Sequence, residues 1–365
     1  MANIYIIGSG VIGRAMAFDL ARNHQVFLAD SNQPSLDAVQ FQNQSIQTKH
    51  LDVKNHQSLS QWVKQADIVM LAVPGFLGYE ALRTILEARK NVVDISFSPE
   101  NALNLSSFAK ERGATAIVDA GVAPGIPNYL LGYYNTKIEI NSFEYYVGGL
   151  PKYPKPPFNY KAPFSPIDVI EEYTRPARMM INGKIVVKPA MSDVEIIHFD
   201  PIGQLEAFNT DGLRSILNTM NHIPNMKEKT LRYPGHADVM KEFRDQGLFS
   251  ESKIGKTSSD LFGEWHLDEC EPEFTIMKIL ISGVENGVKK IINFNLYDEY
   301  DSETDTPSMS RTTGYTATAT INMLLNDLWV KPGVFPPEII GQNEDCFNFI
   351  LDYLKQRNIQ IIREK

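Results

Sequence analysis

The amino-acid sequence predicts an α/β fold, in which an N-terminal doubly wound parallel sheet is followed by a second α+β domain on a mostly antiparallel sheet. Three observations predict this fold. A short apolar run enters a glycine loop and a helix, strand and helix patterns then alternate over roughly the first 120 residues, and β-rich, proline-rich segments follow. The 365 residues suffice for two domains of roughly 100–200 residues each.

Apolar runs and helical stretches alternate through the first part of the chain. Runs of about four to eight residues are typical of buried strands, and longer stretches with helical spacing are typical of helices. This alternation indicates βαβ units and therefore a parallel sheet. The expected strands cover residues 4–7, 25–29, 46–53, 68–73, 91–95 and 116–119. The expected helices cover the stretch that ends at residue 22, a polar stretch before residue 46, and residues 59–65, 78–89 and 100–112.

The alternation of strand and helix patterns ends after Gly121. Prolines are dense between residues 151 and 166 and interrupt β-rich pieces, which suits an antiparallel domain with long ordered loops. Strands are expected at 143–147, 184–187, 275–282 and 291–297, and helices at 309–325 and 344–356. We therefore expect a first domain at residues 1–125, a second at 126–306, and a C-terminal helical segment at 307–365 that returns to the first domain.

The composition excludes several classes of protein. The net charge is −9 and no basic block is present to neutralise phosphates, so we expect no nucleic-acid partner. No stretch approaches the roughly 20 apolar residues of a membrane span, and the N-terminus lacks a signal-peptide pattern, so we expect a cytoplasmic protein without a membrane partner. Cys270 and Cys346 are too few for a disulfide framework, and no zinc-site spacing occurs, so we expect no metal.

The strongest motif is the glycine loop Gly8-Ser9-Gly10-Val11-Ile12-Gly13, which directly follows the first strand and opens a helix. In this pattern the first glycine permits a tight turn, the second lets the backbone approach a pyrophosphate, and the third lets the helix pack on the strand. Asp30 ends the second strand and is the acid expected to bind the adenosine ribose and repel a 2′-phosphate. We therefore expect a Rossmann domain that binds NAD, with NADP less favoured. The alternative for Asp30 is a turn aspartate.

Other strand ends are expected to line the same crevice, because ligands bind outside the carboxyl ends of parallel strands. Asp94 and Asp119 are positioned to orient a cofactor amide or a substrate ammonium. Each strand-end residue also has a local explanation, as a solvated turn residue, a Pro-Gly turn or a cap. The expected cofactor-binding residues are Gly8, Gly10, Val11, Ile12, Gly13, Asp30, Asp52, Val73, Pro74, Ser96 and Gly121.

Several further segments carry a family resemblance. Residues 73–78, 93–97, 119–125 and 147–151 together resemble the saccharopine dehydrogenase-like family of amino-acid dehydrogenases. Residues 156–161, 172–178, 206–208, 210–214 and 230–236 resemble its lysine 6-dehydrogenase branch most. The resemblance implies NAD-dependent oxidation of L-lysine at the ε-carbon, which releases ammonia and gives allysine and then piperideine-6-carboxylate. It also implies a homodimer, with the substrate bound by the second domain.

Two other functions stay open. Saccharopine reductases share residues 148–151, 160–161 and 231–233 of this pattern and act on a larger substrate with a glutamate moiety, whose extra carboxylates need Arg or Lys. His236, which ends the last motif, favours the lysine branch. Outside the enzymes, the alternative is a non-catalytic NAD-binding sensor or scaffold, because fold alone does not fix function.

Oxidation of an amine needs a proton acceptor. The reacting nitrogen must be neutral before hydride leaves its carbon, so we expect a base near the nicotinamide. The candidate catalytic residues are His236, whose ordinary pKa is nearest neutrality, Lys161 and Asp119. The alternatives are a structural histidine bonded to a backbone carbonyl and a packing role for Lys161.

Substrate binding is a separate task. A guanidinium binds a carboxylate in a bidentate manner, which makes Arg214 and Arg232 the candidates for the α-carboxylate. Thr230, Tyr160 and Asp94 are the further substrate-binding candidates. The alternative for each arginine is a structural salt bridge, and for Tyr160 it is domain packing.

Overall fold

The computed structural model describes residues 1–267 and 271–364, so Cys270 lies outside the described residues. The chain divides into two compact units. The first unit comprises Met1–Tyr133 and Ser310–Asn358, and the second comprises Tyr134–Met309 and Ile359–Lys365. The first boundary therefore lies within helix α6 (Ile126–Asn135), and most of the C-terminal segment belongs to the first unit.

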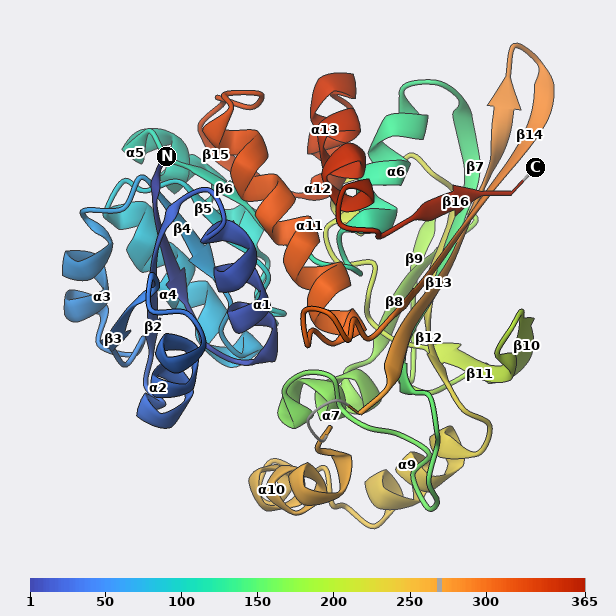
Figure 1. Cartoon of the computed structure of the whole chain (residues 1–365). Coiled ribbons are helices and arrows are strands. Elements are labelled where there is room, and N and C mark those ends of the chain that lie inside the picture. The colour runs from blue at the N-terminus through green and yellow to red at the C-terminus, as the bar shows by residue number, and fades with distance from the viewer. Residues whose placement is uncertain (268–270, 365) are drawn as a thin grey trace. The chain divides into compact units, whose positions relative to one another are not determined.

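The first unit is built on a 7-stranded sheet in the order β15-β6-β5-β4-β1-β2-β3 (Figure 1). All of its strand pairs are parallel, and β1 lies between β2 and β4, so the strand order reverses there. This is the predicted doubly wound sheet. The strands are β1 (Asn3–Ile7), β2 (Gln25–Asp30), β3 (Gln47–His50), β4 (Ile68–Leu71), β5 (Val92–Asp94), β6 (Thr115–Ile117) and β15 (Gly333–Phe335).

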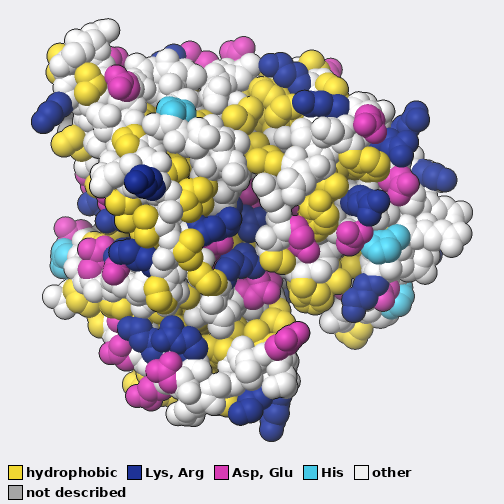
Figure 2. All heavy atoms as spheres, turned by 180° about the vertical axis from the view of Figure 1, so that it is seen from behind, with side chains coloured by type: hydrophobic (Ala, Val, Ile, Leu, Met, Phe, Trp, Pro, Cys, Tyr) yellow, Lys and Arg dark blue, Asp and Glu magenta, His cyan; other side chains and the backbone are white. Residues whose placement is uncertain are grey.

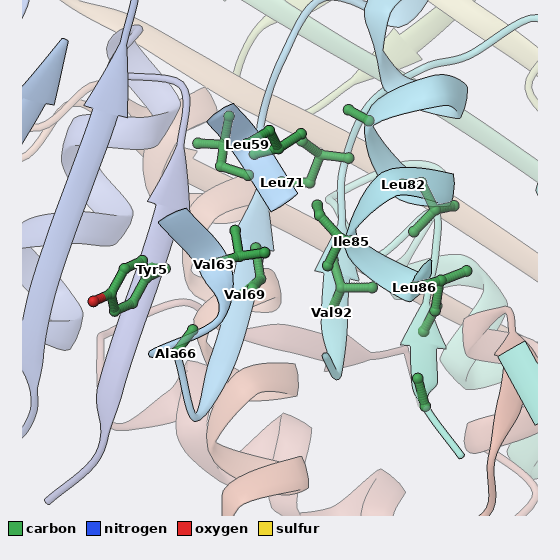
Figure 3. Packing of buried hydrophobic residues seen from close by; sticks show 14 of the residues in the cluster. Tyr5, Leu59, Val63, Ala66, Val69, Leu71, Leu82, Ile85, Leu86 and Val92 are labelled. Atoms are coloured by element: carbon green, nitrogen blue, oxygen red, sulfur yellow. The ribbon is translucent and has the colours of Figure 1, made fainter. Parts of the chain in front are cut away.

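Helices cover this sheet because their apolar faces match the strands. Figure 3 shows side chains of α3 and α4 packed against strand residues such as Val69 and Val92, in a cluster that excludes water. On α11, Gly314 lies against Met16 and Ile12 of α1, so these two helices pack together as well. The helices are α1 (Val11–Leu20), α2 (Gln33–Gln42), α3 (His56–Val63), α4 (Gly75–Glu87), η1 (Ala102–Leu105), α5 (Ser106–Arg112), α6, α11 (Ser308–Leu325), α12 (Pro337–Ile340) and α13 (Glu344–Lys355).

Some predicted elements differ from the structure at their ends. The strand expected at 46–53 is only β3, because it is the sheet's edge and pairs with β2 over four positions, ending at Asp30 and His50. The helix expected at 100–112 is split into η1 and α5; the side chain of Asn101 accepts a hydrogen bond from the Leu103 N–H and starts η1 separately. Strand β15 and helix α6 were not predicted.

The second unit is built on a mixed, mostly antiparallel 9-stranded sheet, as predicted. Its main path runs β10-β11-β12-β7-β13-β14-β16, and only the β12–β7 pair along it is parallel. The strands are β7 (Glu139–Pro151), β8 (Ala177–Ile181), β9 (Lys184–Lys188), β10 (Glu195–Phe199), β11 (Gly203–Asn209), β12 (Asn225–Arg232), β13 (Glu273–Glu285), β14 (Val288–Glu299) and β16 (Ile361–Arg363).

Three helices of the second unit, α7, α9 and α10, bury a core rich in aromatic residues. Trp265 on α10 and Tyr173 on α7 are its largest fully buried side chains. Their rings meet edge to face, with centroids 6.4 Å apart. The helices are α7 (Pro166–Thr174), α8 (Ile216–Thr219), α9 (His236–Asp245) and α10 (Ile254–Trp265).

The surface carries both signs of charge. On the face shown in Figure 2, lysine and arginine side chains are interspersed with acidic and hydrophobic ones. None of the helices in the described ranges is both long and apolar enough to cross a bilayer. Among the residues that the structure describes, no three His, Cys, Asp or Glu side chains are grouped as metal ligands would be.

Candidate functional site

The glycine loop between β1 and α1 is held by close backbone contacts. Gly8 has φ 107, and a Cβ there would lie 2.1 Å from the carbonyl oxygen of Ala72. A Cβ on Gly13 would lie 2.0 Å from the carbonyl oxygen of Gly8. A Cβ on Gly10, in contrast, would meet nothing within 4 Å. Gly8 and Gly13 therefore shape the turn, whereas Gly10 keeps space open at the N-terminus of α1, where backbone N–H groups favour a phosphate.

Asp30, at the end of β2, binds the glycine loop. Its carboxylate accepts the Ser9 N–H at 2.6 Å through one oxygen and the Asn32 N–H at 2.8 Å through the other. The Ser35 hydroxyl donates to the Ser9 carbonyl oxygen at 2.8 Å and fixes the same loop from α2. Asp30 is only half-buried and lies at the carboxyl end of β2, which is the edge at which a ribose is expected. The ribose contact itself stays a prediction.

On the other side of β1, the ends of β5 and β6 are tied to each other. The Asp94 carboxylate accepts the Ser96 N–H at 2.7 Å, and the Ala120 N–H donates to the Asp94 carbonyl oxygen at 3.4 Å. This bond matches the local, turn-forming role named as the alternative for Asp94, and a contact with cofactor or substrate stays a prediction. Asp119 is buried with φ 57. Gly121 donates its N–H to the Pro124 carbonyl oxygen at 3.1 Å, which closes a tight loop after β6.

Three other predicted cofactor residues lie at strand ends without a distinctive geometry. Asp52 is exposed after β3 and accepts the Lys54 N–H at 2.9 Å, as a turn aspartate does. Val73 and Pro74 follow β4 and are half-buried, with Pro74 at the N-cap of α4. Their contacts with a cofactor stay predictions, as do those of Val11 and Ile12 on α1.

The glycine loop, the acid after β2 and the strand ends beyond β4 fit a dinucleotide. The order reversal at β1 places the Asp30 side and the Asp94–Gly121 side on opposite halves of one crevice. An adenosine ribose suits the first half, so the other nucleoside lies over β4, β5 and β6 in such folds. When bound, a nicotinamide group would accept hydride from a substrate carbon.

A second group of polar residues is buried within the second unit. Arg232, at the end of β12, donates from Nε to the Tyr173 hydroxyl at 3.0 Å and from Nη2 to the Glu172 carboxylate at 3.0 Å. Its Nη1 donates to the Leu231 carbonyl oxygen at 2.9 Å. The guanidinium carbon lies 4.4 Å from the centre of the Tyr160 ring. All three nitrogens of Arg232 therefore have protein partners in this conformation, which is the structural role named as its alternative.

His236, the first residue of α9, is buried beside this arginine. Its Nδ1 lies 2.8 Å from the Phe158 carbonyl oxygen, which accepts only, so Nδ1 carries the proton. Its Nε2 lies 2.9 Å from the Tyr173 hydroxyl and accepts from it. Burial, together with the charge of Arg232, lowers the pKa of His236 to about 3. The imidazole is therefore neutral at physiological pH, and the bond to a backbone carbonyl matches the alternative to a catalytic role.

The other predicted residues of the second unit are dispersed. Lys161 donates from Nζ to the His266 carbonyl oxygen at 2.7 Å and lies 3.9 Å from Glu271. The Thr230 hydroxyl lies 2.8 Å from the Thr210 hydroxyl and is buried. Arg214 is half-buried with φ 44. The structure thus brings Tyr160, Arg232 and His236 together. The other three predicted residues take part in contacts elsewhere in the unit.

Sequence reasoning assigned no role to three carboxylates of this unit. Glu172 pairs with Arg232. Glu206, on β11, accepts the Gly235 N–H at 2.9 Å and the Ala237 N–H at 2.5 Å, which fixes the N-terminus of α9 around His236.

The third carboxylate is that of Glu228, on β12. It accepts the Thr210 hydroxyl and the Gly212 N–H, and burial raises the pKa of Glu228 to about 8. Glu172 and Glu206 lie inside the motifs that carry the resemblance, and that position was the available signal.

Two family models match the chain in succession. The model of the saccharopine dehydrogenase NADP binding domain matches residues 4–117. The model of the saccharopine dehydrogenase C-terminal domain matches residues 121–359. The first match covers strands β1 to β6, from residue 4 onward, and the glycine loop. The second covers strand β15 of the first sheet and the whole second sheet except its last strand, β16.

Relatives with established names are similar over part of their length. Mouse mitochondrial alpha-aminoadipic semialdehyde synthase is 24% identical over 262 residues, which are 68% of this chain and 28% of that protein. Saccharopine dehydrogenase [NADP(+), L-glutamate-forming] of Pyricularia oryzae is 25% identical over 218 residues, which are 56% of this chain and 48% of that protein. The chain therefore spans less than half of the length of either relative.

A solved structure with a similar fold matches over the full chain. It is apo saccharopine dehydrogenase (L-Glu forming) from Saccharomyces cerevisiae, with a TM-score of 0.80 and 17% sequence identity. The match covers 100% of this chain and 99% of the yeast chain. This likeness shows that the two proteins share a fold.

Proposed function

Because the chain belongs to the saccharopine dehydrogenase family, we propose that it is a nicotinamide-dinucleotide-dependent oxidoreductase that acts on the CH–NH group of an amino acid. The observation that carries the proposal is the glycine loop. Gly8 and Gly13 are fixed by backbone contacts, while Gly10 keeps open space at the N-terminus of α1. The family match supports amine oxidation over the non-catalytic sensor.

The proposed substrate is L-lysine, oxidised at its ε-carbon. The ε-carbon of the neutral amine loses hydride to the oxidised dinucleotide, and a C=N bond forms to the ε-nitrogen. Water then adds to this imine carbon. Ammonia leaves to give allysine, and one proton is released overall. The motifs at 210–214 and 230–236 support this branch by resemblance.

Saccharopine is the second candidate substrate. The named relatives favour it, because two of them are a saccharopine dehydrogenase and an alpha-aminoadipic semialdehyde synthase. The same steps would then release L-glutamate in place of ammonia. A larger, more anionic substrate needs further cations, and Arg214 is the predicted arginine whose place outside the buried Arg232 cluster suits that task.

The proposed cofactor is NAD, although the name of the family model and that of the fungal relative lean toward NADP. The argument for NAD is the Asp30 carboxylate at the end of β2, which a 2′-phosphate would approach with like charge. The next residues, Ser31, Asn32 and Gln33, add no positive charge. The name of the family model describes the family as a whole, whereas Asp30 is a residue of this chain and bears directly on its own choice of cofactor.

The predicted catalytic and substrate residues keep distinct proposed roles. Asp119, Lys161 and His236 remain the candidates for the base. Both ring nitrogens of His236 are already hydrogen-bonded in this conformation, to Tyr173 and to Phe158. Arg214 and Arg232 are the proposed carboxylate binders, and Arg232 would have to exchange its bond to Glu172 for one to the substrate. Tyr160, Thr230 and Asp94 complete the proposed substrate set, and the protein is proposed to act as a homodimer.

The deciding experiment compares substrates and cofactors in one assay. Purified protein is mixed with L-lysine or saccharopine and with NAD or NADP at mildly alkaline pH, and reduced dinucleotide is followed by absorbance. Turnover of lysine with release of ammonia supports L-lysine as the substrate. Turnover of saccharopine alone overturns that assignment and supports saccharopine as the substrate. Dinucleotide binding by calorimetry without turnover of any amine would overturn the proposed activity and favour the sensor.

A further inference from the structure

The loop that follows β6, residues 121–125, is held by a buried side chain. The Gly121 N–H donates to the Pro124 carbonyl oxygen at 3.1 Å, and the Gly125 N–H donates to Oδ1 of Asn128 at 3.2 Å. Asn128 lies in the first turns of α6 and is fully buried. One amide side chain therefore fixes the end of the loop.

The other end of the Asn128 amide reaches far along the sequence. Its Nδ2 donates to Oε2 of Glu338 at 2.8 Å, and Glu338 on α12 is also fully buried. A buried carboxylate that accepts from an amide holds that amide in one orientation, so Oδ1 must face the Gly125 N–H. Both residues belong to the first unit.

Backbone packing around this pair leaves little room for movement. A Cβ on Gly132 of α6 would lie 2.2 Å from the Glu338 carbonyl oxygen, and a Cβ on Gly341 would lie 2.3 Å from the Tyr129 carbonyl oxygen. The Tyr129 hydroxyl lies 2.8 Å from the Thr320 hydroxyl of α11. Helices α6, α11 and α12 thus form a rigid support behind the loop.

The loop occupies one half of the dinucleotide crevice. It follows β6, on the side of β1 opposite to Asp30, and the Ala120 N–H ties it to the end of β5. The adenosine half is expected at Gly8–Gly13 and Asp30, where neither Asn128 nor Glu338 contributes. A change in the loop should therefore act on the half of the ligand that carries the nicotinamide.

We propose that Asn128 and Glu338 are positioning residues that set the 121–125 loop for the nicotinamide half of the dinucleotide, and that the C-terminal segment completes the cofactor site through Glu338. This inference rests on the proposed dinucleotide binding. It assigns no proton transfer to either residue, since both act through the loop backbone.

A charge swap across the pair tests the proposal. Asn128→Asp places a second carboxylate 2.8 Å from Glu338 and removes the donated hydrogen bond. The double variant Asn128→Asp with Glu338→Gln restores a donor and an acceptor in reversed order, and the introduced aspartate still has an oxygen that accepts from the Gly125 N–H. Glu338→Gln alone keeps an acceptor for Asn128 and serves as the folding control.

The readout is the affinity for two ligands, measured by calorimetry. The first ligand is the dinucleotide that the wild type prefers. The second is the fragment of that dinucleotide without nicotinamide, which is ADP-ribose for NAD and 2′-phospho-ADP-ribose for NADP. We expect Asn128→Asp to weaken the dinucleotide at least tenfold and the fragment less than threefold, and the double variant to recover to within threefold of the wild type. Equal losses for both ligands, or no loss, would overturn the positioning role. If Asn128→Asp fails to fold, Asn128→Ala takes its place, because it removes the bonds to Gly125 and Glu338 without adding a charge. The same criteria then apply: a selective loss of the dinucleotide supports the positioning role, and equal losses or no loss overturn it. Absence of binding by the wild type would instead refute the proposed function.

Discussion

The hydroxyl oxygen of Tyr173 lies 2.9 Å from Nε2 of His236. Burial raises the pKa of Tyr173, so this hydroxyl stays protonated and donates to the imidazole. Arg232 donates to the same hydroxyl oxygen from its other side. The direction of every bond is thereby fixed, from Arg232 through Tyr173 and His236 to the Phe158 carbonyl oxygen, and one tautomer of His236 results.

Replacing Tyr173 with Phe should destabilise the protein by about 1–3 kcal/mol, because a buried imidazole nitrogen and a guanidinium N–H then lose their partner. Urea unfolding at neutral pH measures the change. The matched control is Tyr153→Phe, since Tyr153 is 66% exposed, and it should leave the free energy of unfolding unchanged. Equal effects of the two substitutions would contradict the directed chain of bonds.

Asp30 is expected to decide the choice between NAD and NADP. Asp30→Ala should lower the affinity for NAD at least tenfold, with little change for NADP, because the ribose acceptor and the repulsion of a 2′-phosphate disappear together. The alanine also removes the acceptor for the Ser9 and Asn32 N–H groups. Asp30→Asn keeps one acceptor oxygen and controls for this loosening of the loop. Calorimetry with both dinucleotides measures the result, and equal losses for NAD and NADP would indicate a purely structural aspartate.

Gly8 and Gly10 should respond differently to the same added methyl group. Gly8→Ala forces φ 107 on an L side chain and a clash with the Ala72 carbonyl oxygen, so a destabilisation of about 2–3 kcal/mol is expected. Gly10→Ala meets nothing within 4 Å and should change stability by less than about 1 kcal/mol. The affinity for dinucleotide should nevertheless fall, because the methyl group occupies the space beside α1. Unimpaired binding by Gly10→Ala would show that no pyrophosphate lies there.

The first unit was predictable because its signals are local. The period of apolar residues indicates β1 and α1, and the spacing from Gly10 to Asp30 follows from the βαβ connection. The partners of Asn128 were not predictable, since Glu338 is 210 residues away and nothing in either neighbourhood indicates the other. Strand β15 was missed for a different reason, because three residues of sequence are too few to show a period.

The second unit was harder to predict because charged residues are buried there. In β12, Glu228, Lys229 and Thr230 are consecutive, and so polar a run is typical of a solvated strand, yet all three are buried. Their burial depends on partners from other strands and loops, such as Thr210 for Glu228 and Glu195 for Lys229. His236 was singled out from its motif, while its partners Tyr173 and Phe158 come from a helix and a loop that sequence spacing does not connect.

Glu228 should make stability depend on pH. Its pKa is raised to about 8 by burial, with Glu172 and Asp211 adding negative charge, whereas an unfolded glutamate titrates near 4.5. Between these values the native state holds a proton that the unfolded state has lost, so this residue makes stability fall as pH rises from about 4.5 to about 8. Above about pH 8 Glu228 is ionised in both states, and the free energy of unfolding is lowered by the full cost of burying its carboxylate.

The variant Glu228→Gln isolates this contribution, because the amide resembles the protonated acid and can accept from Gly212 while it donates to Thr210. We expect the variant to be more stable than the wild type at pH 9 and to approach it as pH falls toward 5. The difference between the two proteins is the quantity to measure, by urea unfolding at each pH, since His236 contributes an opposite slope in both: its lowered pKa costs stability as pH falls below 6.5. A difference that does not vary with pH would mean that Glu228 stays ionised throughout, held by its hydrogen bonds despite burial.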